Sequence, residues 1–179
     1  MMARNTNKIN YEDDYYKGLA KPYFFGILDK IIEYGNLSDE EGLILDFGCG
    51  QGYLTKALGY PKNVIGYDII ESLTEVKDYK KLNPKVMVCS GVLEHMTTEE
   101  INDLMIWCQE RNIKKLLVFL PTENIVSKIG MILTGQINAH DDHITKFKDV
   151  NNIIERYYKI KRRCYYFFRM AQITLYEMV

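Results

Sequence analysis

The sequence has no long apolar run, no paired cysteines and almost no net charge. Its apolar stretches fall short of the ~20 residues that a membrane-spanning helix needs, and segment 4–8 is polar, unlike a signal peptide. The cysteines at positions 49, 89, 108 and 164 form no C-x-x-C pair, which favours free thiols in a reducing compartment over disulfides. We therefore expect a cytoplasmic protein without a membrane span.

The net charge of −1 provides no overall field that would attract nucleic acid or anionic lipid. The chain carries one basic cluster, at Lys159, Lys161, Arg162 and Arg163. We expect these side chains to line the solvated side of an edge strand, and we do not expect nucleic acid as a partner.

Hydrophobic periodicity divides the chain into alternating helices and strands. We expect helices at 22–34, 53–58, 97–110, 122–133 and 147–157, strands at 43–46, 64–68, 86–90 and 116–120, a small strand at 74–79, and a pair of C-terminal strands. Near-continuous apolar strands separated by helices indicate a buried parallel sheet. The predicted fold is therefore α/β, Rossmann-like and doubly wound, with a mostly parallel sheet of six or seven strands and a C-terminal antiparallel strand pair.

A glycine-rich turn follows the first strand. Asp46 closes the strand, and Gly48, Gly50 and Gly52 then stand at every second position, around Cys49. Glycine lets a ligand approach the backbone closely, and the following helix directs unpaired N–H groups back toward the turn. Since ligands of open α/β sheets bind at the carboxyl ends of the strands, we expect a nucleoside to bind at this turn.

Two strand-end acids narrow the choice of nucleoside. The glycine spacing differs from the G-x-G-x-x-G of dinucleotide folds, and Asp46 before it suits an ammonium group. Asp68, followed by Ile69, ends the next strand, where a carboxylate can accept both hydroxyl hydrogens of a ribose. An amino-acid end and a ribose together indicate S-adenosylmethionine (AdoMet) as the cofactor. The alternative is a structural turn with Asp68 as a solvated acid.

These motifs resemble those of class I AdoMet-dependent methyltransferases. The first motif of that family is similar to residues 44–52 (ILDFGCGQG), and the second to residues 64–68 (VIGYD). The fourth-strand motif of the type 11-like small-molecule branch resembles residues 86–96 (VMVCSGVLEHM), and the segment after its fifth strand resembles residues 140–147 (HDDHITKF). The resemblance implies a seven-stranded sheet whose last strand is antiparallel.

The resemblance predicts a single methyltransferase domain over 1–179, with an N-terminal helical cap at 1–40 and an AdoMet-binding core at 41–179. The cofactor-binding residues expected from the motifs are Asp46, Gly48, Cys49, Gly50, Gly52, Asp68, Ile69 and Ser90. The chain departs from the family between the second strand and Val86, where only 17 residues stand in place of a helix and a third strand. We expect that helix to be missing and the adenine pocket to be partly open.

The acceptor side is assigned to two histidines of the 140–147 segment. Because histidine titrates near neutrality, His143 or His140 can take a proton from a hydroxyl or an acidic carbon. A role as a loop anchor or a metal ligand remains open, but two histidines three positions apart, with no further ligand cluster, lead us to expect no metal. His95, beside Glu94, is expected to be a helix-entry residue.

The sequence as a whole predicts an AdoMet-dependent methyltransferase that acts on an O or C atom of a small-molecule or lipid-like acceptor. Segment 90–95 lacks the Asn/Asp-Pro-Pro-aromatic tetrapeptide typical of methylases acting on exocyclic or amide nitrogens. The alternative, which the short 69–85 segment favours, is an AdoMet-binding or interaction protein without methyl transfer. The aromatic C-terminal strands would suit a homodimer.

Overall fold

The computed structural model describes residues 18–122 and 143–178. Its strands are β1 (Ile44–Phe47), β2 (Val64–Tyr67), β3 (Val86–Ser90), β4 (Lys115–Pro121), β5 (Tyr158–Tyr166) and β6 (Ala171–Met178). Its helices are α1 (Lys21–Gly35), α2 (Tyr53–Ala57), α3 (Thr98–Glu110) and α5 (Phe147–Ile154), with short 3-10 helices η3 (Gly18–Ala20), η4 (Leu37–Asp39), η5 (Tyr79–Lys81) and η6 (Leu93–His95). The helix expected at 122–133 lies almost wholly outside the described residues, as does His140.

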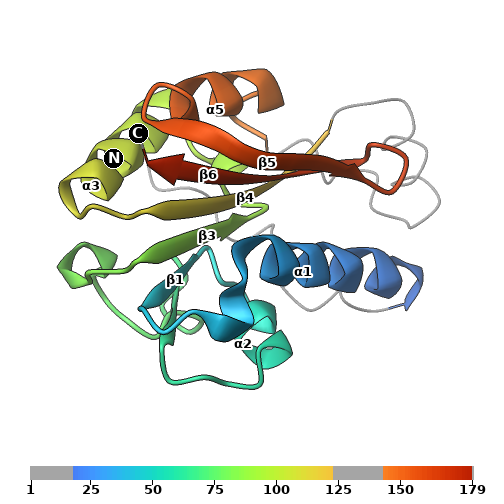
Figure 1. Cartoon of the computed structure of the whole chain (residues 1–179), viewed down its shortest axis with the longest axis horizontal. Helices are drawn as coiled ribbons and strands as arrows, with labels where there is room; N and C mark the ends of the chain where they lie inside the picture. Colours follow the sequence, from blue (N-terminus) through green and yellow to red (C-terminus); the bar gives the residue numbers. More distant parts are fainter. Residues whose placement is uncertain (1–17, 123–142, 179) are drawn as a thin grey trace.

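The six strands form one sheet in the order β2-β1-β3-β4-β6-β5 (Figure 1). Strands β1 to β4 pair in parallel, whereas β6 runs antiparallel to both of its neighbours, β4 and β5. Phe47 pairs with Tyr67 on one side and with Cys89 on the other, so the carboxyl ends of β1, β2 and β3 meet at one edge of the sheet. The doubly wound, mostly parallel sheet with its antiparallel C-terminal pair is confirmed, with six strands.

Alternate residues of the strands face two separate hydrophobic cores, because side chains of a strand point to opposite faces in turn. Met87 and Val118 pack in the core that α3 and α5 cover. Val88 and Leu117 pack in the core that α1 and α2 cover. The helices therefore lie on both faces of the sheet (Figure 1), which explains why the central strands read as continuous apolar runs.

The strand expected at 74–79 is wrong, because the described segment between β2 and β3 contains only the 3-10 helix η5. Glu75 docks on β2 through a single residue: its backbone N–H donates to the Gly66 carbonyl (3.0 Å), and its carboxylate accepts the Gly66 N–H (2.6 Å). The side chain thus occupies the donor that a further strand would pair with. Strand β2 remains the edge of the sheet, and the expected loss of the helix in this segment is confirmed.

Tyr79 anchors the shortened segment to the core instead. Its ring lies 4.7 Å from that of Tyr67, 5.1 Å from that of Phe47 and 4.9 Å from that of Trp107, measured between ring centroids. Such tilted and edge-on aromatic contacts are favourable beyond the area they bury. One tyrosine therefore covers part of the sheet face that the missing helix would otherwise cover.

The structure also bears on the expectations of free cysteines and of no membrane span. The four cysteines, all within the described part of the chain, are free thiols. None of the helices within 18–122 and 143–178 combines the length and the hydropathy needed to cross a bilayer.

Candidate functional site

The loop between β1 and α2 contains three glycines with positive φ, at +78° for Gly48, +49° for Gly50 and +68° for Gly52. The N–H groups of Gly48 and Cys49 both donate to the carbonyl of Tyr67, at 2.7 and 3.1 Å, which fastens the loop to the end of β2. A Cβ added at Gly50 or Gly52 would meet no atom within 4 Å. The backbone there borders open space, so a ligand can approach it as the spacing predicts.

Asp68 joins the glycine loop to the segment after β2. One of its carboxylate oxygens accepts the N–H of Gly50 and the other accepts the N–H of Ile70, each at 3.0 Å. Its side chain is only 9% exposed, yet each oxygen keeps a second lone pair for another donor. Asp68 is therefore placed to accept ribose hydroxyls while it holds the loop, a second role that the sequence did not reveal. Ile69 is 61% exposed at the rim.

Asp46 is buried at the carboxyl end of β1, with 3% of its surface exposed. Burial, followed by the nearby charges of Glu75 and Asp68, raises the pKa of this carboxyl to about 7. Desolvation and like charges both disfavour the ionised form. A cation bound beside these three acids would relieve both costs, so this end of the site favours a positively charged ligand group.

Cys49 turns its thiol away from the open side of the loop. The Sγ atom donates to the Leu73 carbonyl at 3.5 Å, and it would lie 2.8 Å from a Cβ added at Gly66. Burial, with the nearby carboxylates, raises the pKa of the thiol to about 12, so the thiol is neutral and structural. Its contact with a cofactor stays a prediction.

The end of strand β3 holds Ser90, whose contact with a cofactor stays a prediction, and leads to the residues around Glu94. The strand ends at Ser90, which is half-buried, and Gly91 follows with φ of +66° and donates its N–H to the Phe119 carbonyl at 3.2 Å. This turn leads into η6, which holds Glu94 and His95. His95 is the last residue of η6 and lies two residues before Thr97, the N-cap of α3, so its role as a helix-entry residue stays a prediction.

Residue 143 is held against η6 by backbone hydrogen bonds. The N–H groups of Ile144 and Thr145 donate to the carbonyl of Glu94, at 2.8 and 3.1 Å. As a result the imidazole of His143 lies edge-on to that of His95, with 5.2 Å between ring centroids. The structure thus brings together two histidines that are far apart in the sequence, whereas His140 lies outside the described residues.

Glu94 is the site residue that sequence reasoning missed. Its side chain is 4% exposed, and burial raises its pKa to about 8. Its Oε2 atom has no hydrogen-bond partner among the residues of 18–122 and 143–178. Glu94, His95 and His143 each place one potential ligand atom within 4.8 Å of the others. The available signal was the adjacent Glu-His pair directly after a buried strand.

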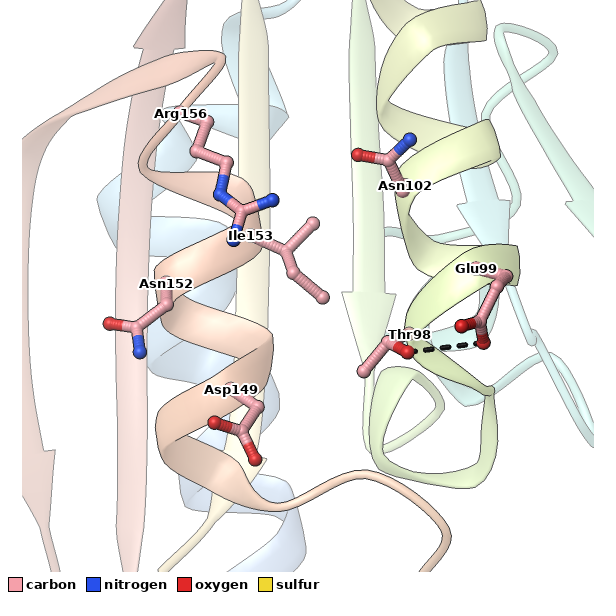
Figure 2. A pocket seen from close by; sticks show the side chains of 7 residues that line it. All are labelled: Thr98, Glu99, Asn102, Asp149, Asn152, Ile153 and Arg156. Atoms are coloured by element: carbon pink, nitrogen blue, oxygen red, sulfur yellow. Dashed lines mark hydrogen bonds between the residues drawn. The ribbon is translucent and has the colours of Figure 1, made fainter.

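A separate groove of about 500 Å³ lies between α3 and α5. It is lined by Thr98, Glu99, Asn102, Asp149, Asn152, Ile153 and Arg156. Figure 2 shows these side chains and the hydrogen bond from the Thr98 hydroxyl to Glu99, at 3.1 Å. No residue of the glycine loop lines this groove, so it is distinct from the strand-end site.

Three of the four basic residues of the cluster on β5 have partners within the fold. Arg163 pairs with Glu155 at 2.8 Å, and Lys161 pairs with Glu177 at 3.2 Å. The guanidinium of Arg162 lies 4.2 Å from the centroid of an aromatic ring on α1. These partners agree with the expectation that the cluster belongs to the surface of an edge strand.

No family model and no curated protein matches the chain, but solved structures do. The magnesium protoporphyrin IX methyltransferase (ChlM) of Synechocystis PCC 6803, with bound SAH, matches with a TM-score of 0.67 at 18% identity, over 94% of this chain and 93% of that one. A SAM-dependent methyltransferase from Archaeoglobus fulgidus matches with a TM-score of 0.63 at 16% identity, over 93% and 97%. The PH0226 protein of Pyrococcus horikoshii OT3 matches with a TM-score of 0.67 at 14% identity, over 94% and 95%. The chain therefore has the fold of class I AdoMet-dependent methyltransferases.

Proposed function

We propose that this protein is an AdoMet-dependent methyltransferase acting on an O or C atom of a small-molecule or lipid-like acceptor. The observation that carries the proposal is the pair of buried strand-end acids, Asp46 and Asp68, beside an open glycine loop. AdoMet presents an ammonium, a sulfonium and a ribose diol, which these acids can neutralise or accept. A dinucleotide would bring its anionic pyrophosphate to the same place, where carboxylates repel it.

The solved structures support the cofactor, because the ChlM methyltransferase that shares this fold was crystallised with SAH and with SAM. We further propose that 1–179 form a single domain and that 41–179 bind the cofactor. Helix α1, from the first 40 residues, packs on β4 and β6. It is therefore part of the structural framework, as well as a candidate cap over the site.

AdoMet carries an activated methyl group, so the protein mainly has to position the acceptor. The methyl carbon forms a bond to the acceptor atom as its bond to sulfur breaks. The bonding pair stays on sulfur, which yields S-adenosylhomocysteine, and the acceptor loses its proton. The sequence assigns proton removal to His143 or His140, and the half-buried His143 lies beside Glu94 and His95.

The test combines calorimetry with transfer of a tritium-labelled methyl group. We expect AdoMet to bind one site per chain, and labelled methyl to appear in an acceptor with a hydroxyl or an acidic C–H group. Absence of AdoMet binding would contradict the proposal. Binding without transfer to hydroxyl, acidic-carbon or lipid-like acceptors would favour the second candidate, a cofactor-binding module, which the shortened 69–85 segment supports.

The affinity for AdoMet is expected to rise as the pH increases from 5.5 to 7. The pKa of Asp46 is about 7 in the free protein, and a bound ammonium favours the ionised carboxylate. Below pH 7 binding must therefore displace a proton, which weakens it by up to about tenfold per pH unit. Calorimetry at fixed ionic strength measures this slope.

The variant Asp46→Asn provides the control for this slope. It should bind more weakly at pH 7 and show a nearly flat profile over the same range, because it has no proton to lose. An equal slope in both proteins would assign the pH dependence to another group and remove Asp46 from the ammonium site.

A further inference from the structure

Three side chains with metal-ligating atoms meet at the carboxyl end of β3. Glu94 and His95 come from η6, and His143 comes from the segment that leads into α5. Their nearest ligand atoms all lie within 4.8 Å of one another. The donor set consists of two imidazole nitrogens and one carboxylate oxygen, from two segments of the chain that only the fold brings together.

One carboxyl oxygen of Glu94 has no structural use that the described residues reveal. This Oε2 atom is buried and unpartnered within 18–122 and 143–178, although buried polar atoms are nearly always hydrogen-bonded and an unpaired buried carboxylate is costly. The anchoring of the 143–145 segment uses the backbone carbonyl of Glu94, not its carboxylate. A role as a loop anchor therefore leaves this acid unexplained, whereas a bound cation would explain it.

We propose that Glu94, His95 and His143 together bind one divalent transition-metal ion. Imidazole and carboxylate ligands suit Zn²⁺, Mn²⁺, Fe²⁺ and Co²⁺. Metal–ligand bonds of roughly 2.0–2.2 Å place two ligand atoms about 3.4 Å apart in a tetrahedral site and at most about 4.3 Å apart in any geometry. The three ligand atoms, which lie within 4.8 Å of one another, must therefore move closer together when the ion binds. Both imidazoles are half-buried, which leaves them room for that shift.

The metal site adjoins the cofactor loop. Val92, two residues before Glu94, packs so closely on the loop that a Cβ at Gly48 would lie 2.5 Å from its Cγ2. Gly91 lies between the end of β3 and the cluster, and a Cβ there would lie 3.7 Å from the carboxylate of Glu94. An ion at the cluster would therefore lie on the acceptor side of the loop, opposite the Asp68 end.

This inference deepens the proposed function and rests on it in one respect, the identity of the acceptor. Three protein ligands leave coordination positions open, as in catalytic rather than structural metal sites. An acceptor hydroxyl that occupies one of them would have its pKa lowered and its oxygen held for the methyl group. The acceptor class would then be a hydroxyl compound methylated on oxygen, and His143 would act as a metal ligand in place of a general base.

The test is a titration of the full chain with Co²⁺, after treatment with a chelator and in the absence of AdoMet. Binding is monitored by visible absorption and by calorimetry. We expect one Co²⁺ per chain with ligand-field bands, and displacement by Zn²⁺. The variants Glu94→Gln and His143→Ala should each bind Co²⁺ about 100-fold more weakly or worse, since even residues that only support metal ligands cost 10–100-fold. The variant Glu99→Gln, an exposed acid on the first turn of α3, is the matched control and should bind as the wild type does.

His95→Ala keeps the test decisive if Glu94→Gln unfolds, because His95 is half-buried and its replacement removes a ligand without touching the buried acid. Thermal unfolding by circular dichroism identifies variants that remain folded. Absence of Co²⁺ binding to the wild type, or binding that both His95→Ala and His143→Ala leave unchanged, would overturn the inference. AdoMet binding without Co²⁺ binding would overturn the metal site alone, and the reverse result would overturn the proposed cofactor alone.

Discussion

Replacing Asp68 with asparagine is expected to weaken AdoMet binding by about 100-fold. Hydrogen bonds to a charged group contribute roughly 1.5–3 kcal/mol each, and about 1.4 kcal/mol corresponds to a factor of ten. The expected loss of AdoMet affinity has two sources. One is the loss of hydrogen bonds to the ribose, and the other is a change in the loop, because Asp68 also accepts the N–H groups of Gly50 and Ile70. In the variant an amide NH2 replaces one of those acceptors and faces a backbone donor.

A ligand analogue separates the two sources. S-adenosylhomocysteine that lacks the ribose hydroxyls should bind the wild type at least 10-fold more weakly than intact S-adenosylhomocysteine, whereas in Asp68→Asn the removal of the hydroxyls should change the affinity little. An equal penalty in both proteins would mean that Asp68 organises the loop without contacting the ribose. Asp78→Asn is the matched control, because the Asp78 carboxylate likewise accepts a backbone N–H, that of Lys80 at 3.0 Å, on the separate helix η5. Its affinity for the ligand should equal that of the wild type.

Replacing Gly48 with alanine is expected to lower the free energy of unfolding by about 2–5 kcal/mol. The φ of +78° costs an L-residue roughly 1–2 kcal/mol, and the added Cβ would lie 2.5 Å from Cγ2 and 2.7 Å from Cβ of Val92. Overpacking of that kind costs roughly 1–3 kcal/mol. Urea denaturation followed by circular dichroism measures the change, and the distorted loop should also bind AdoMet more weakly.

Gly59 provides a matched control for the backbone cost. Its φ is +79°, yet a Cβ there would meet nothing within 4 Å, so Gly59→Ala should cost only the roughly 1–2 kcal/mol of the left-handed conformation. The double variant Gly48→Ala, Val92→Ala should recover much of the remaining difference. An equal loss of unfolding free energy in Gly48→Ala and Gly59→Ala would show that the close contact with Val92 does not destabilise the variant.

The sequence by itself determined the features that depend on neighbouring residues. The glycine spacing specified a turn with positive φ. The helix expected at 97–110 begins at a capping box of Thr97 and Glu100, with bonds of 3.2 and 2.8 Å. The order of strands and helices followed from hydrophobic periodicity, and the apolar character of the strands indicated burial on both faces. These features follow from sequence because backbone sterics and side-chain period act over a few residues.

The tertiary structure alone decided the features that join distant segments. Glu75 docks on Gly66 and ends the sheet at β2, where the sequence suggested one further strand. The two carboxylate oxygens of Asp68 accept backbone N–H groups of Gly50 and Ile70. The cluster of Glu94, His95 and His143 forms only because the carbonyl of Glu94 accepts hydrogen bonds from the two residues that follow His143. Contacts between segments far apart in the chain form when the fold closes the loop between them, and no local pattern encodes which groups then face each other.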